Sequence, residues 1–121
     1  MIRRGFFDWQ KPVGETGDLA DLVVGVIVLL KKQGLEVSED QFYKYLPKAL
    51  VEFTGLRIPK DWLYQAVERS LQLGVQLSSR FRGFEVSPQT LEKLKARAGE
   101  RFIEKACQPI ADQLAEKLKE R

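Results

Sequence analysis

Apolar positions between residues 18 and 33 recur three and four residues apart and predict a helix from Asp18 to Gln33. Further valines and leucines widen this stripe, so the helix should be the most buried in the fold. Lys31 and Lys32 lie in its last turn and Gly34 follows, the order that the helix dipole and glycine termination favour. The stripe consists of Leu19, Leu22, Val23, Val26, Ile27 and Leu30.

A second helix is expected to begin at Ser38, because Ser38 and Gln41 have the spacing of a capping box. Pro47 lies inside the helical pattern, where it removes one hydrogen bond and crowds the preceding turn. We therefore expect either a kink at Pro47 or a junction between two short helices there. Gly55 ends the segment. The apolar positions with helical spacing are Phe42, Leu46, Leu50 and Phe53.

A third helix followed by a two-stranded ribbon is predicted next. Pro59 is suited to a first helical position, and Gly74 stops the helix after Leu73. The ribbon extends to Val86, with its turn within residues 79–83. Its candidate strand residues are Val75, Leu77, Phe84 and Val86.

The C-terminal region is expected to be helical. Ser87 should cap a helix over residues 89–98, and a last helix should run from Glu100 towards Arg121, restarted by Pro109. Its apolar seam consists of Phe102, Ala106, Ile110, Leu114 and Leu118. The seam either packs on its own domain or forms a homodimer interface. The expected organisation is therefore an irregular N-terminal segment (1–17), a helical domain (18–98) and a C-terminal helix (99–121).

Charge is unevenly distributed along this chain of 121 residues, whose net charge is +3. The segment from Arg57 to Arg82 holds five basic and two acidic residues, so it carries the whole net charge. The rest of the chain holds fifteen of each sign. A local excess of this kind indicates a basic face.

Three short segments resemble winged helix-turn-helix regulators of bacteria and archaea. Residues 50–56 are similar to the second helix and turn, which often carry Thr-Gly-Leu, here residues 54–56. Residues 66–75 are similar to the end of the recognition helix, and residues 80–88 to the wing and the Ser/Thr-Pro start of the next helix. The resemblance covers residues 18–98. It implies a mainly α fold with a three-helix winged-helix core, a small β-hairpin and a C-terminal helical extension, and a homodimer through a terminal helix.

The resemblance also implies DNA binding, with helix 59–73 in a groove and the wing, residues 78–84, on phosphates. The expected partner is double-stranded DNA, bound by a transcriptional regulator or by an accessory factor of replication or of a mobile element. The candidate contacts are Arg57, Lys60, Tyr64, Gln65, Arg69, Arg80 and Arg82. Each has an alternative reading, because helix 59–73 could present an ordinary solvated face, and charges at a hairpin edge can serve to prevent aggregation.

Other functions are less favoured by the residue inventory. The chain has no histidine and no glycine-rich phosphate loop, so we expect no enzyme and no cofactor. One cysteine, Cys107, excludes an intramolecular disulfide and a cysteine-ligated metal site. The longest apolar run, Leu22 to Leu30, is too short for a membrane span, and a cytoplasmic location is expected. The competing hypothesis is a protein-binding adaptor that uses Phe6, Phe7 and Trp9 or the C-terminal seam.

Overall fold

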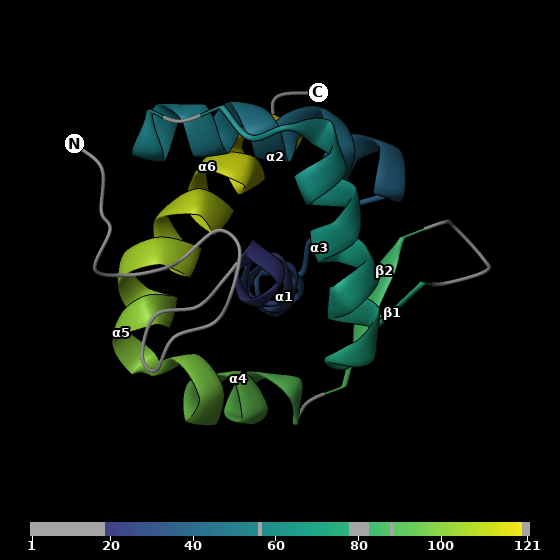
Figure 1. Cartoon of the computed structure of the whole chain (residues 1–121), viewed down its shortest axis with the longest axis vertical. Helices are drawn as coiled ribbons and strands as arrows, with labels where there is room; N and C mark the ends of the chain where they lie inside the picture. The colour runs from purple at the N-terminus through teal and green to yellow at the C-terminus, as the bar shows by residue number, and fades with distance from the viewer. Residues whose placement is uncertain (1–18, 56, 78–82, 88, 120–121) are drawn as a thin grey trace.

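The computed structural model describes residues 19–55, 57–77, 83–87 and 89–119. These residues form a mainly α fold with a small antiparallel hairpin, which confirms the predicted fold class. Figure 1 shows helix α1 (Leu19–Lys32) end-on at the centre, with the other helices arranged around it. The surrounding elements are α2 (Glu39–Thr54), α3 (Lys60–Gln72), α4 (Thr90–Ala98), α5 (Glu100–Phe102), the π-helical turn η1 (Ile103–Cys107), α6 (Gln108–Lys119), β1 (Val75–Leu77) and β2 (Phe84–Val86).

Helix α1 forms the centre of the core, as its broad apolar stripe predicted. All twelve residues from Leu19 to Leu30 are buried. The buried carboxylate of Asp21 accepts a hydrogen bond at 2.9 Å from the Arg97 guanidinium on α4, so this charge is compensated. Gly25 lets α1 approach η1 closely, because a Cβ at this position would come within 2.3 Å of Cys107 Sγ.

Helix α2 begins with the predicted capping box. The Gln41 backbone N–H donates to Ser38 Oγ, and the Ser38 backbone N–H donates to Gln41 Oε1. Pro47 lies inside one continuous helix, so the alternative of two short helices is wrong. Gly55 ends α2 in the left-handed conformation, with φ 77°.

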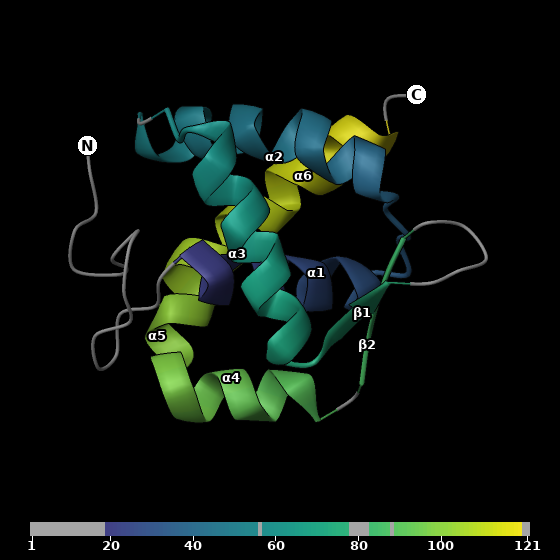
Figure 2. The ribbon, with the colours of Figure 1, turned by 45° about the vertical axis from the view of Figure 1, so that its right-hand side comes forward.

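The hairpin packs beside α1 and α2. Strands β1 and β2 form an antiparallel pair (Figure 2). Val75 lies opposite Val86, and an isolated bridge joins Ser38 to Gly83. Phe84 contacts Phe42 edge-on, with ring centroids 5.1 Å apart, and both side chains are fully buried. These contacts connect the start of α2 to the strand that follows the turn.

The helix after the hairpin lacks the serine cap that the sequence predicted. Helix α4 begins at Thr90, with Gln89 at its N-cap position and no side-chain hydrogen bond to the backbone there. The Ser87 hydroxyl lies 3.0 Å from the Thr90 hydroxyl instead. The Ser87 cap was therefore wrong, because the first residues form a turn in which the Thr90 N–H donates to the Ser87 carbonyl.

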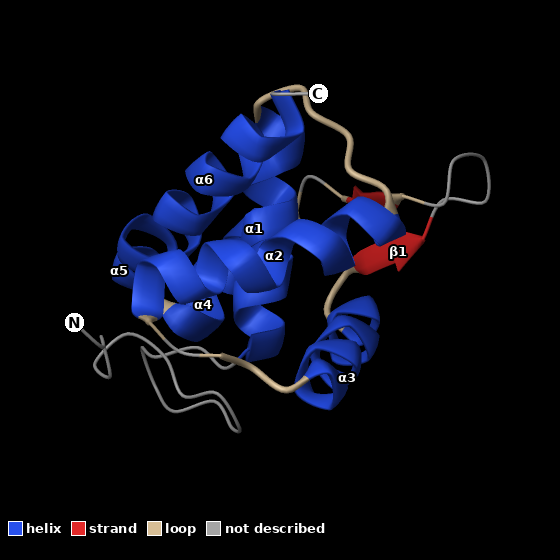
Figure 3. Ribbon diagram, turned by 90° about the horizontal axis from the view of Figure 1, so that it is seen from above, coloured by secondary structure: helices blue, strands red, loops and turns tan. Residues whose placement is uncertain are grey.

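The C-terminal seam packs on its own chain. Phe102, Ala106, Ile110 and Leu114 are fully buried, and Leu118 packs against the core. Helices α5 and α6 lie on one side of α1, while α3 and the hairpin lie on the other (Figures 1 and 3). Residues that fill the core within one chain are not available to a partner, so the predicted homodimer gains no support from this seam.

The C-terminal segment is continuous from Glu100 to Lys119 but contains the wide turn η1. In this turn the Gln108 N–H donates to the Ile103 carbonyl, five residues back. Pro109, which was expected to restart the helix, follows immediately and has no N–H to continue the ladder. Among the residues the structure describes, no helix is long and apolar enough to cross a membrane.

Candidate functional site

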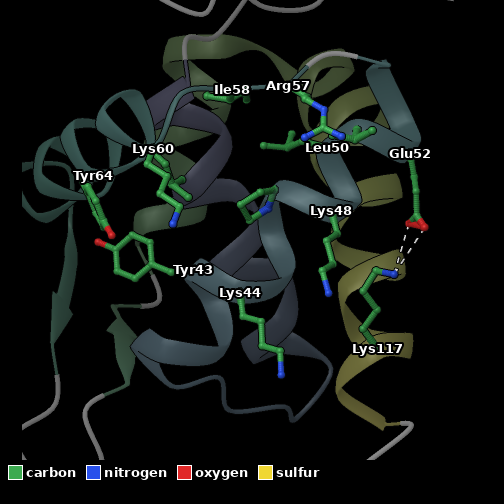
Figure 4. A pocket seen from close by; sticks show the side chains of 13 residues that line it. Tyr43, Lys44, Lys48, Leu50, Glu52, Arg57, Ile58, Lys60, Tyr64 and Lys117 are labelled. Atoms are coloured by element: carbon green, nitrogen blue, oxygen red, sulfur yellow. Dashed lines mark hydrogen bonds and ion pairs between the residues drawn. The ribbon is translucent and has the colours of Figure 1, made fainter.

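A cleft of about 780 Å³ opens between α2 and α3 (Figure 4). Its walls come from the exposed side of α2, the segment that joins α2 to α3, the first turns of α3, and one residue of α6. The residues lining it are Tyr43, Lys44, Pro47, Lys48, Leu50, Val51, Glu52, Arg57, Ile58, Lys60, Leu63, Tyr64 and Lys117. A volume of this size is within the range of sites that hold small molecules or single building blocks of polymers.

The lining combines apolar and cationic side chains. Leu50 and Leu63 are buried, Pro47 and Ile58 are half-buried, and Val51 is 38% exposed. Valine in a helix at this exposure leaves apolar surface in water, which the fold itself does not require. The apolar part of the lining can therefore bury part of a bound molecule.

Cations surround these apolar residues. Lys44 and Lys48 are one helical turn apart on α2, Arg57 lies in the segment that joins α2 to α3, and Lys60 is the first residue of α3. Lys44 Nζ and Lys48 Nζ lie 5.3 and 5.9 Å from the centre of the Tyr45 ring. Neither Arg57 nor Lys60 forms an ion pair with another described residue.

Among the described residues that line the cleft, Glu52 is the only acidic one, and it is already paired. Lys117 Nζ lies 3.4 Å from a carboxylate oxygen of Glu52. The lining therefore carries five basic residues and one acidic residue. This imbalance gives the cleft a positive potential that favours an anionic ligand.

Two tyrosines border the cleft. The rings of Tyr43 and Tyr64 meet edge-on, with centroids 4.9 Å apart and planes at 64°. Tyr64 is 51% exposed, whereas Tyr43 is half-buried. Burial raises the pKa of Tyr43, and the neighbouring Glu39, Tyr64 and Glu68 raise it further. Its hydroxyl therefore stays protonated near neutral pH and can donate a hydrogen bond.

The structure brings together three of the seven residues predicted to contact DNA. Arg57, Lys60 and Tyr64 line the cleft. Gln65 and Arg69 are exposed on α3 but do not line it. The two residues predicted for the wing tip, Arg80 and Arg82, lie outside the described residues, as does the N-terminal cluster of Phe6, Phe7 and Trp9.

Sequence reasoning missed four of the basic and aromatic residues of the cleft, namely Tyr43, Lys44, Lys48 and Lys117. Lys44 and Lys48 do carry a signal, because two lysines four residues apart form a repulsive pair on one helix face. Lys117 comes from α6, 65 residues beyond its partner Glu52. Only the packing of α6 along α2 reveals that contact.

No group of three or more potential metal ligands occurs among residues 19–55, 57–77, 83–87 and 89–119. Comparisons with models of protein families, with curated proteins and with solved structures find no match to this chain. Functional inference therefore rests on the cleft itself.

Proposed function

We propose that this protein binds nucleic acid, with its phosphates on the cations of the α2–α3 cleft. The observation that carries the proposal is the five-to-one ratio of basic to acidic residues among the described residues of the lining, where the carboxylate of Glu52 is already paired. Phosphate neutralisation by lysine and arginine supplies most of the affinity in non-specific binding. Among the described residues, no ion pair of Arg57 or Lys60 would have to be broken before these side chains meet a phosphate.

The order of elements supports the same proposal. Three helices are followed by a hairpin, which is the order of elements in a winged helix. Proteins with that fold most often bind nucleic acid. DNA is the target that this resemblance implies. Roles in transcription, in replication or in a mobile element are proposals of the same kind.

A fluorescence anisotropy titration tests the proposal. A labelled mixed-sequence duplex and one of its separated strands would each be titrated at about 50 and about 200 mM salt. If about four cations meet phosphates, affinity for the bound form should fall on the order of 100-fold between these conditions. The absence of binding to either form at low salt would overturn the proposal and favour the adaptor hypothesis.

Charge-matched variants locate the site. Arg57→Ala/Lys60→Ala should weaken binding and lower the slope of log K against log salt by about two. Lys93→Ala/Lys105→Ala removes two exposed lysines of α4 and η1, outside the cleft. This control should leave both quantities almost unchanged. Equal losses in the two variants would show that net charge, rather than the cleft, governs binding.

A further inference from the structure

We propose that the α2–α3 cleft takes single-stranded nucleic acid, with one unstacked base on its apolar lining beside Tyr64 and the flanking phosphates on the surrounding cations. This inference rests on the proposed function and specifies the form of nucleic acid bound. It is carried by the juxtaposition of apolar lining, paired tyrosines and basic rim within one concave site.

The shape of the site separates single strands from duplexes. A duplex presents phosphates and base edges, and keeps the faces of its bases stacked inside. No apolar base face of a duplex is free to enter the cleft and cover its accessible apolar lining, which comes from Pro47, Val51 and Ile58. An unpaired base is flat and partly apolar. When it enters the cleft, the face of the base and the exposed part of Val51 are both shielded from water.

The charges on α3 point the same way. Asp61 and Glu68 are exposed on this helix together with Arg69, so its outward face is mixed in sign. Insertion of that face into a major groove would bring two carboxylates towards the phosphates on either side. The unmixed positive charge lies instead beside the cleft, at Lys60 and Arg57.

The tyrosines provide a stacking platform. Proteins that bind single strands without sequence preference combine a basic groove with aromatic side chains on which bases stack. Tyr64 has half of its surface exposed, and its edge contact with Tyr43 restricts the ring before any ligand arrives. A restricted ring loses less conformational entropy on binding.

The basic rim offers a path for the backbone on both sides of such a base. Figure 4 shows Lys60 on the α3 side of the cleft and Lys44 and Lys48 along the α2 side, with Arg57 at one end. A strand that crosses the cleft would meet cations before and after the base. This placement matches a chain of phosphates better than a single anionic group.

The test compares three labelled ligands of about twelve nucleotides at one salt concentration. They are oligo(dT), an abasic strand with the same number of phosphates, and a duplex of the same length. Oligo(dT) should bind about tenfold more tightly than the abasic strand, because base stacking adds to phosphate contact. It should also bind more tightly than the duplex.

Each other outcome overturns the inference in a distinguishable way. Equal affinity for oligo(dT) and the abasic strand would mean that the cleft binds polyanions and has no base site. The same conclusion would follow if poly-glutamate displaced labelled oligo(dT) as effectively as unlabelled oligo(dT) does. Tighter binding of the duplex would favour groove reading by α3, and the proposed function would stand. Binding of none of the three would remove the proposed function as well.

Variants at Tyr64 separate stacking from folding. Tyr64→Ala should abolish the preference for oligo(dT) over the abasic strand, whereas Tyr64→Phe should keep it. Leu71→Ala is the matched control, since Leu71 is 38% exposed on the same helix and does not line the cleft. Thermal melts followed by circular dichroism would verify that all three variants are folded. Retention of the preference in a folded Tyr64→Ala variant would refute the stacking role.

Discussion

Charged and apolar side chains have opposite environments in the core formed by the C-terminal helices with α1 and in the α2–α3 cleft. In this core, Arg97 of α4 pairs with the buried Asp21 carboxylate of α1, and the apolar seam of α5, η1 and α6 is buried against α1. At the cleft, Arg57 and Lys60 form no ion pair with another described residue, and Val51 and Tyr64 remain in contact with water.

This difference separates the parts of the molecule that fold it from the part that can bind. Burial of apolar surface and pairing of buried charge stabilise the folded state. Exposed valine and adjacent cations contribute little to that stability and leave surface that a ligand can cover. We therefore expect substitutions of buried residues in this core to change stability, and substitutions in the cleft to change binding.

The largest expected effect comes from Leu114 on α6, which is fully buried. Leu114→Ala should lower the free energy of unfolding by about 2–5 kcal/mol, because it removes apolar contacts and leaves a cavity. Val51→Ala removes a similar side chain from the cleft, where the residue is 38% exposed. Its cost should stay below about 1 kcal/mol. Urea denaturation followed by circular dichroism measures both values.

The same pair of variants addresses the dimer hypothesis. If the seam were an interface between two chains, the stability of the wild type would depend on protein concentration, and Leu114→Ala would lower the sedimentation mass of the folded protein. A core role predicts an unchanged mass. Equal destabilisation by the two substitutions would contradict the contrast between the core and the cleft.

A pH effect should arise at Cys107, which is fully buried between η1 and α1. Burial raises the pKa of this thiol well above its ordinary value of 9.0, and the nearby Asp21 adds to the shift. Below pH 9.0 the thiol is protonated in both the folded and the unfolded chain. Above it the unfolded chain loses the proton while the folded chain keeps it. The free energy of unfolding should therefore fall, with a slope approaching about 1.4 kcal/mol per pH unit.

Denaturation series between about pH 8 and pH 10 measure this slope. The range ends there because the pKa of Tyr43 is also raised from 10.0, and its titration adds to the fall at higher pH. Cys107→Ala is the control, and its curve should be flatter between pH 9 and pH 10 than that of the wild type. Parallel curves would mean that another group causes the fall in the free energy of unfolding. They would also mean that burial at Cys107 does not disfavour the thiolate.

Local signals in the sequence predicted the helices well, because capping and termination depend on neighbouring residues. Ser38 with Gln41 placed the start of α2, and Gly55 placed its end. The expected cap at Ser87 was wrong, since a serine followed by proline matches both a cap and a simple turn. Only the packed structure distinguishes these two.

The candidate site was harder to predict because it joins distant segments. Arg57, Lys60 and Tyr64 lie in one stretch, and their charge excess was visible in the sequence. Lys44 and Lys48 lie outside that stretch, in the part of the chain where basic and acidic residues are equal in number. They join the site only because the packing of α2 against α3 places them around one cleft. A concave surface is a property of packing, and no hydrophobic pattern along the chain encodes it.

The smallest expected effect on stability comes from Lys48 at the cleft. Lys48→Ala removes the repulsion of Lys44 one turn away, a gain of about 0.2–0.5 kcal/mol. It also removes a cation 5.9 Å from the Tyr45 ring, a loss of about 0.5–1 kcal/mol at an exposed site. The two terms nearly cancel, so the free energy of unfolding should change by less than about 0.5 kcal/mol while affinity for nucleic acid falls several-fold. Lys48→Arg should restore the affinity. A loss of stability above about 1 kcal/mol would mean that this lysine supports the fold, and the division between the two regions would fail at α2.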